Sequence, residues 1–254
     1  MLQGNNIVNF SEAQLNNKAW ANMIEFVPIF LTNEVPAFIF VTDQSSGSNS
    51  LIVRDAETDA SVFTGSLTVT SSGSDTIVKG GGNSTSGKSC GYYYLDVVIN
   101  GKHFYSDVFG WVDSVDDRNL IKISYTTTDL RLGGRVDLPY NSFTVHFYLS
   151  CNGITIESEI DEEGVEKPFG VLPVYNTCNI KRVAEINGTA QIFRHLSMLR
   201  VIGVNGGITL EYKNESKSIY ETEVEVKDSS EFGETMIIDL TYKEYDFIST
   251  KNEI

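Results

Sequence analysis

Eight residues in the first half of the chain match a pattern that binds phosphate. Residues 82–89 read Gly-Asn-Ser-Thr-Ser-Gly-Lys-Ser, which fits the P-loop pattern. In a P-loop, a buried strand precedes the glycines and a helix follows them. The first N–H groups of that helix and the lysine then hold the phosphates of a nucleotide. In this chain, Gly82, Gly87, Lys88 and Ser89 would make those contacts.

The residues around this motif do not provide that setting. Residues 90–99 read Cys-Gly-Tyr-Tyr-Tyr-Leu-Asp-Val-Val-Ile, and tyrosines with β-branched residues are typical of a strand. Residues 236–239, Met-Ile-Ile-Asp, resemble the apolar run with an aspartate that binds magnesium in such enzymes, but they too lie in a strand-like stretch. We therefore interpret residues 82–89 as a Gly/Ser-rich loop between two strands. We expect no nucleotide or other cofactor.

The histidines and cysteines do not form a recognisable catalytic pattern. The three histidines are His103, His146 and His195. None of them stands near a serine or cysteine nucleophile signature, and the chain has no HExxH motif and no nucleophile elbow. The three cysteines, which are Cys90, Cys151 and Cys178, suit neither a disulfide framework nor a zinc site. We predict that the protein is not an enzyme.

Two acidic clusters have a chemical and a simpler interpretation. One contains Asp113, Asp116 and Asp117, and the other is Asp-Glu-Glu at residues 161–163. Two carboxylates that flank a sugar cleave glycosidic bonds, and clustered carboxylates bind calcium. The spacing of the first cluster matches no calcium loop, and residues 159–164 are most simply a solvated turn between strands. We expect no metal site in either cluster.

Composition and charge exclude several classes of partner. The chain has 254 residues and a formal net charge of −15, which disfavours binding to a nucleic-acid backbone or to an anionic membrane surface. The apolar cluster at residues 24–40 is interrupted by charged residues and prolines and is unsuited to span a bilayer. No secretory signal is visible, so we expect synthesis in a reducing cytoplasm.

Short apolar runs separated by turn residues predict an all-β fold with two β-sandwich domains. Residues 1–22 are rich in Asn and Gln and are interpreted as an N-terminal arm. Residues 23–115 are predicted to form an immunoglobulin-like sandwich, with strands at 25–31, 37–42, 51–54, 61–70, 76–79, 92–99 and 102–108. Asn100-Gly101 between the last two runs is a strong hairpin signal.

Residues 116–254 are predicted to form a second β-rich domain with one short helix near 189–201. Its strands are expected at 120–125, 142–149, 154–160, 171–177, 180–186, 218–226 and 235–242. Thr189 is a suitable helix cap, and Ile192, Leu196 and Leu199 share one helical face. Residues 201–204 and 208–212 are expected to form a hairpin around Asn-Gly-Gly at 205–207.

Three segments of the chain resemble a family of uncharacterised β-rich proteins from tailed phages of Bacteroidetes, crAss-like phages included. The segments are Cys-Gly-Tyr-Tyr-Tyr-Leu at 90–95, Phe-Tyr-Ser-Asp-Val-Phe at 104–109 and Leu-Ile-Lys-Ile-Ser-Tyr at 120–125. The late helix at 191–202 and the final strands at 221–226 and 236–242 are also similar, whereas the first 65 residues lie outside the resemblance. The family pattern offers no catalytic residue.

The resemblance implies a structural component of the virion, in a tail, neck or portal-proximal ring. Expected partners are copies of the chain in a ring and the portal, tail or neck subunits, and the expected location is the virion after synthesis in the bacterial host. The alternative is a glycan-binding adhesin or carbohydrate-binding module, since similar sandwiches host both roles. An adhesin should expose Trp or Tyr platforms, whereas we interpret the aromatic residues at 92–111 as core and subunit interface.

Overall fold

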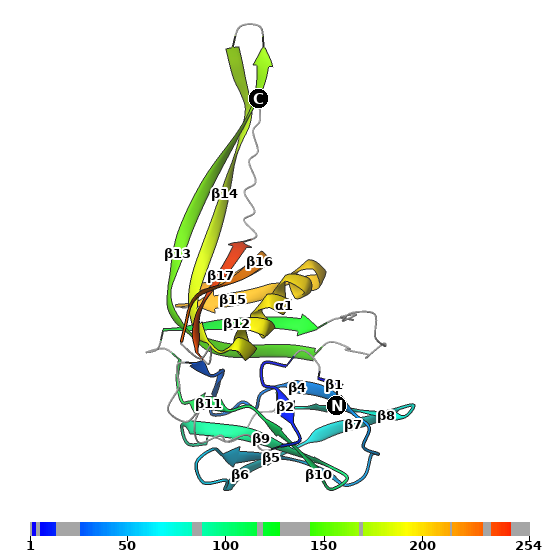
Figure 1. Cartoon of the computed structure of the whole chain (residues 1–254). Coiled ribbons are helices and arrows are strands. Elements are labelled where there is room, and N and C mark those ends of the chain that lie inside the picture. The colour runs from blue at the N-terminus through cyan, green and yellow to red at the C-terminus, as the bar shows by residue number, and fades with distance from the viewer. Residues whose placement is uncertain are drawn as a thin grey trace.

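The protein is mostly β, as the sequence predicts, and its described residues form strands in two sheets and one helix. The structure is a computed structural model that describes residues 2–3, 6–13, 26–82, 88–115, 119–127, 143–167, 170–213, 215–230 and 235–244. Figure 1 shows a first part that contains strands β1 to β11 and a second part that contains β12 to β17 and the helix α1. A long hairpin rises from the second part, away from the first.

The first part consists of two facing sheets. Its strands are β1 (Leu2–Gln3), β2 (Phe10–Ser11), β3 (Ile29–Leu31), β4 (Phe38–Thr42), β5 (Asn49–Asp55), β6 (Ser61–Gly65), β7 (Leu67–Ser72), β8 (Asp75–Gly80), β9 (Gly91–Ile99), β10 (Lys102–Ser106) and β11 (Phe109–Val112). One sheet has the order β1-β4-β8-β7, and β9 is the centre of the other, where it pairs with β5, β10 and β11. Aromatic rings fill the space between the sheets: the ring centroids of Phe40 and Phe104 lie 5.2 Å apart.

The predicted hairpin between β9 and β10 is confirmed. Asn100 and Gly101 connect the two strands with φ values of 50° and 79°. Two consecutive positive φ values are typical of a type I′ turn, whose twist matches that of the flanking strands. The strong local signal of the Asn-Gly dipeptide therefore sets this register.

The second part is a closed barrel instead of the second sandwich that the sequence suggests. Its strands are β12 (Leu120–Thr127), β13 (Phe143–Lys167), β14 (Gly170–Gly188), β15 (Ile208–Tyr212), β16 (Glu215–Ser229) and β17 (Met236–Glu244). The strands pair in the order β12-β15-β16-β17-β14-β13, and β13 pairs again with β12. All of these pairings are antiparallel. The circuit therefore closes, which removes the edges that two separate layers would leave.

Helix α1 (Ala190–Gly206) completes the core of the barrel and confirms the predicted helix. The Thr189 side chain caps it by accepting a hydrogen bond from the N–H of Ile192. Ile192, Leu196 and Leu199 are all at most 1% exposed and belong to the same core as the inward residues of the strands. Arg194 lies on the exposed side of the helix. The apolar spacing read from the sequence therefore selects the face that is buried.

Three other local predictions are wrong. Residues 201–206 continue α1 instead of forming a strand, and Gly207 ends the helix with a φ of 75°. The strands expected at 142–149 and 154–160 are one strand, β13, and those expected at 171–177 and 180–186 are one strand, β14. The expected turn at 159–164 lies within β13, where Asp161 is paired with Thr177 and a register shift follows Glu163. Glycine and acidic residues mark a bulge there, not a chain reversal.

The two parts share one sheet through β3. This strand pairs in parallel with β11, and Ile29 also pairs with Tyr148 of β13. Ile29 and Tyr148 belong to a small buried cluster with Val112 and Leu120. The connection is therefore a hydrogen-bonded and packed junction between residues on both sides of the expected boundary at 115–116.

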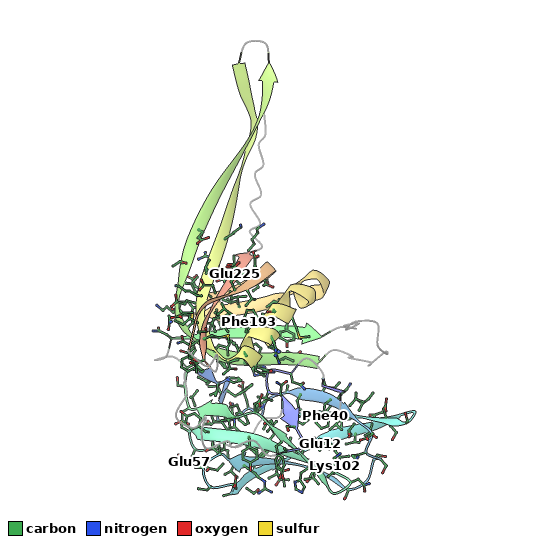
Figure 2. The ribbon with its side chains drawn as sticks, in the orientation of Figure 1. Glu12, Phe40, Glu57, Lys102, Phe193 and Glu225 are labelled. Atoms are coloured by element: carbon green, nitrogen blue, oxygen red, sulfur yellow. The ribbon has the colours of Figure 1, made fainter. Side chains whose placement is uncertain are left out.

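The N-terminal residues that the structure describes belong to the first part, which differs from the expected arm. Ile7, Val8 and Phe10 are at most 2% exposed. The Asn6 side chain bonds the backbone of Ile39 in both directions, with distances of 2.9 and 2.8 Å. Glu12 forms an ion pair with Lys102 of β10 at 2.9 Å (Figure 2). Apolar residues spaced through the Asn-rich segment are enough to anchor it; residues 14–22 lie outside the described residues.

Asp107 binds the N-terminal residues 6–13, and its burial lowers the stability of the folded protein by an amount that depends on pH. Its carboxylate accepts a hydrogen bond from the N–H of Asn9 at 3.2 Å, yet burial raises its pKa to about 6. At neutral pH the folded protein keeps a charge that burial disfavours, and this cost disappears at about pH 3, where the carboxyl is largely protonated in both the folded and the unfolded state. We expect Asp107→Asn to stabilise the protein by about 2 kcal/mol at pH 7.5 and by almost nothing at about pH 3. Urea unfolding at both pH values measures this difference, and an equal effect at both would contradict it.

Candidate assembly surfaces

The hairpin of β13 and β14 is the most unusual surface of the molecule. Glu157 of β13 and Lys181 of β14 are paired at the point where the hairpin leaves the barrel. Residues 181–188 of β14 still belong to the barrel, because they also pair with β17, and the last of these pairs joins Lys181 to Lys243. Beyond that point, residues 158–167 pair only with residues 170–180. At about 3.3 Å per residue, this ribbon extends about 30 Å from the barrel (Figure 1).

Both edges of this ribbon are open. Strand β12 covers one edge of β13 only up to Ser150, and β17 covers β14 only from Lys181 onwards. Within the described part of the chain, no other strand pairs with residues 158–180. A two-stranded ribbon on its own is marginally stable in water, and unpaired strand edges readily accept another strand. The hairpin therefore has the geometry of an element that is completed by a partner.

The base of the ribbon has one apolar and one acidic face. Ile156 is 61% exposed, which is unusual for a large apolar side chain. Its neighbour along the same face, Ile154, packs against the barrel core, and Glu157 on the opposite face is exposed. In the sequence the same alternation continues as Ser-Glu-Ile-Asp at 158–161. At the base of the ribbon, an apolar side chain that follows the barrel core along the strand is therefore exposed to solvent.

A row of carboxylates lies on the outer surface of the barrel. Glu185, Asp239 and Glu225 are directly opposite one another on β14, β17 and β16, and Glu225 is labelled in Figure 2. Like charges in register repel one another. Lys227 bonds to Glu185 and, together with the Asn152 side chain, lowers the pKa of Glu185. The remaining negative charge favours separation of copies wherever two such surfaces meet.

The phosphate-binding pattern does not have P-loop geometry in the residues that are described. Gly82 follows β8, and Lys88 and Ser89 precede β9, so a strand occupies the place of the required helix. The Lys88 ammonium lies 5.7 Å from the centre of the Phe63 ring, and the Ser89 carbonyl accepts a hydrogen bond from the Tyr93 hydroxyl at 2.9 Å. Gly87 lies outside the described residues. These contacts anchor the end of a connection between two sheets.

The three histidines have structural partners in three different places. His103 contacts the buried Asp96 at 2.8 Å, and Asp96 also binds Arg54 at 2.8 Å. His146 pairs with Glu34 at 3.0 Å across the junction of the two parts. Burial alone would raise the pKa of Glu34, but the hydrogen bond and charge of His146 lower it. These contacts connect strands to one another and bring no two of the histidines together.

His195 lies inside the barrel core. It is 2% exposed, and its Nε2 lies 3.0 Å from the hydroxyl of Tyr125, which is also buried. Burial lowers the pKa of His195 to about 4 and raises that of Tyr125. The hydrogen bond gives Nε2 and the phenol a partner in an apolar core, whereas Nδ1 is buried without a hydrogen-bond partner among the described residues. Sequence analysis places His195 on the helix but does not show that it faces inwards.

The acidic clusters and Trp111, which the sequence offers as candidates for metal or sugar binding, lie in the following places. Residues 161–163 lie in the ribbon, and Asp116 and Asp117 lie outside the described residues. In the described ranges, no group of three or more His, Cys, Asp or Glu side chains is suited to hold a metal ion. Trp111 is 1% exposed, and its indole N–H donates to the carbonyl of Glu34 at 2.6 Å. This tryptophan therefore offers no platform for a sugar.

Neither the protein-family models, nor the curated proteins, nor the solved structures contain a match to this chain. As for membranes, the only helix in the described ranges is too short and too weakly apolar to cross one.

Proposed function

We propose that the chain is a structural subunit of a tailed-phage virion, in a tail, neck or portal-proximal ring, and that it acts by assembly. Its partners are copies of itself and the portal, tail or neck subunits. The observation that carries this proposal is the ribbon of residues 158–180, which extends beyond the barrel and has no further strand on either edge within the described residues. A subunit that combines a closed body with a projecting ribbon has an element that reaches a neighbour.

Two further features support assembly. The family resemblance at residues 90–125 points to virion proteins. The net charge of −15 keeps free subunits apart and soluble until specific contacts form. As part of the same proposal, the first part keeps the immunoglobulin-like assignment that the sequence suggests for residues 23–115.

Glycan binding is the alternative function. It would require exposed aromatic platforms, and the candidate that comes nearest is Tyr105, whose ring stacks on His103 at a centroid distance of 5.7 Å. Tyr105 also lies beside Tyr94 in a packed cluster. A glycan array with the purified protein tests this alternative, and specific binding that Tyr105→Ala removes would favour it over assembly.

Removal of the ribbon tests the proposed function. Joining Glu157 directly to Lys181 through Asn-Gly replaces residues 158–180 by a two-residue turn between residues that already face each other. We expect the barrel to fold, because its pairings with β12 and β17 remain, while incorporation into phage particles is lost. Quantitative mass spectrometry of purified particles measures the copies of the chain per portal subunit.

The full-length chain is the control in this experiment. It should be present in a fixed ratio to the portal, as a ring requires. Absence of the full-length chain from particles would refute a virion role. Normal incorporation of the trimmed chain, with an unchanged circular dichroism spectrum, would show that the ribbon is not the assembly element.

A further inference from the structure

Among the strand edges that the structure describes in the first part, that of β7 has no charge, proline or bulge to protect it. Strand β7 pairs with β8 and, among the residues that the structure covers, with no second strand. Its six residues, Leu-Thr-Val-Thr-Ser-Ser, include no charge and no proline, and its register with β8 is regular. Natural edges are usually blunted by charges, prolines, bulges or shortness. Strand β7 is therefore open to a further strand.

The other edges of the first part are protected. Strands β1 and β2 have two residues each, which is too short to hold another strand. The pairing of β6 with β5 contains a register shift at Val53 and Arg54. One face of β7 packs against the core through Leu67 and Val69, whereas Thr68 and Thr70 on the other face are exposed. At its far end, the Ser71 hydroxyl lies 3.2 Å from that of Ser46.

The ribbon contains an edge of matching length and character. Residues 175–180 of β14 read Tyr-Asn-Thr-Cys-Asn-Ile, without charge or proline, and they pair in unbroken register with residues 158–163 of β13. The remainder of the ribbon is less suitable, because β13 carries acidic residues and β14 has Pro173 beside the register shift. Among the described residues, these two regular, uncharged six-residue edges have no second strand beside them.

These two edges belong to opposite ends of the molecule, as Figure 1 shows: β7 is in the first part and the ribbon rises from the other side of the barrel. They cannot pair within one chain in this fold. In a molecule with a net charge of −15, uncharged edges are the places where two copies approach with least repulsion.

We propose that β7 of one copy pairs with residues 175–180 of a second copy, so that the ribbon adds a strand to the four-stranded sheet of its neighbour. This inference rests on the proposed assembly function and names the partner and both contact surfaces. The contact is heterologous, because each copy contributes residues 175–180 to one neighbour and receives the same residues of another neighbour at its own β7. Repetition of such a contact generates a closed ring or an open stack of copies.

Two variants separate the donor edge from the acceptor edge. The donor-deficient variant is the chain in which Asn-Gly replaces residues 158–180. The acceptor-deficient variant carries Thr68→Glu and Thr70→Glu, which place charge beside the incoming acidic ribbon, and its matched control carries Thr68→Gln and Thr70→Gln. Both threonine side chains are exposed, so we expect all of these proteins to fold.

Sedimentation velocity of the purified chains provides the test. We expect the full chain and the glutamine control to associate, and the glutamate variant to associate more weakly by a factor on the order of ten or more. The donor-deficient variant should be monomeric. Mixed in equal amounts, the two deficient variants should form a dimer and nothing larger, because one intact donor meets one intact acceptor.

Three outcomes would overturn this inference. They are a glutamate variant that associates like its glutamine control, a mixture that stays monomeric while the full chain associates, and a full chain that does not associate at any concentration. None of them bears on whether the chain is present in particles, which is the test of the proposed function. A wrong contact surface is thereby distinguished from a wrong function.

Discussion

Replacing Gly81 with alanine should destabilise the protein more than any other single methyl addition at a described glycine. A Cβ atom at Gly81 would lie 1.9 Å from the carbonyl oxygen of Pro36, which is backbone and cannot rotate away. The residue also has a φ of 79°, a conformation that costs an L-residue about 1–2 kcal/mol. Together with the overlap, the expected loss is about 3 kcal/mol or more.

Gly82 is a matched control on the next residue. It has a φ of 70°, but an added Cβ would have no atom within 4 Å. Gly82→Ala should therefore cost only the backbone strain, about 1 kcal/mol. Urea unfolding of both variants measures the difference, and equal losses would show that the approach to Pro36 is not a constraint. The glycine that the fold requires thus precedes the phosphate-binding pattern, which begins at Gly82.

Acid should destabilise the protein through His195. The folded protein keeps this imidazole neutral down to a pKa of about 4, whereas the unfolded chain protonates it near 6.5. Between these values the unfolded state binds a proton that the folded state does not, so stability is present above pH 6.5 and is lost as the pH falls. At about 1.4 kcal/mol per unit of pKa, the loss approaches 3 kcal/mol at pH 4.

The variant His195→Gln isolates this effect. Glutamine does not titrate, and its amide can occupy the position of Nε2 opposite the Tyr125 hydroxyl. All other groups, including Asp107 with its opposite pH dependence, titrate alike in both proteins and cancel in the comparison. We expect wild type to be the more stable protein at pH 7.5 and to lose that advantage at pH 4.5. A difference in unfolding free energy that is independent of pH would contradict this prediction.

Sequence patterns predict those helices and turns that depend only on residues close together in the chain. The Thr189 cap and the spacing of Ile192, Leu196 and Leu199 predict α1, and Asn100-Gly101 predicts the turn between β9 and β10. Gly206-Gly207 serves as a hairpin turn or as a helix end, and local pattern alone cannot choose between them. Here the packing of the barrel favours the helix end.

The candidate assembly surfaces depend on pairings that no local pattern contains. Whether β12 meets β15 and closes the barrel is decided by long-range packing, and the same holds for the position of β3. The sequence does not predict the ribbon, because the acidic residues and the glycine at 161–164 are typical of a turn between two short strands. An alternation that runs without a break up to such a signal, as from Ile154 to Ile160, is compatible with one long strand that has a bulge at the signal.

The position of β3 has a consequence for synthesis on the ribosome. Residues 29–31 emerge early, yet β3 lies between β11 and β13, and its pairing with β13 waits for Tyr148. The barrel closes later still, because β17 begins only at Met236. A nascent chain therefore carries β3 without its β13 partner until Tyr148 has been synthesised, and contacts this distant in sequence form slowly. The barrel is therefore completed only after residues 236–244 have left the ribosome, and the surfaces that depend on its closure form no earlier.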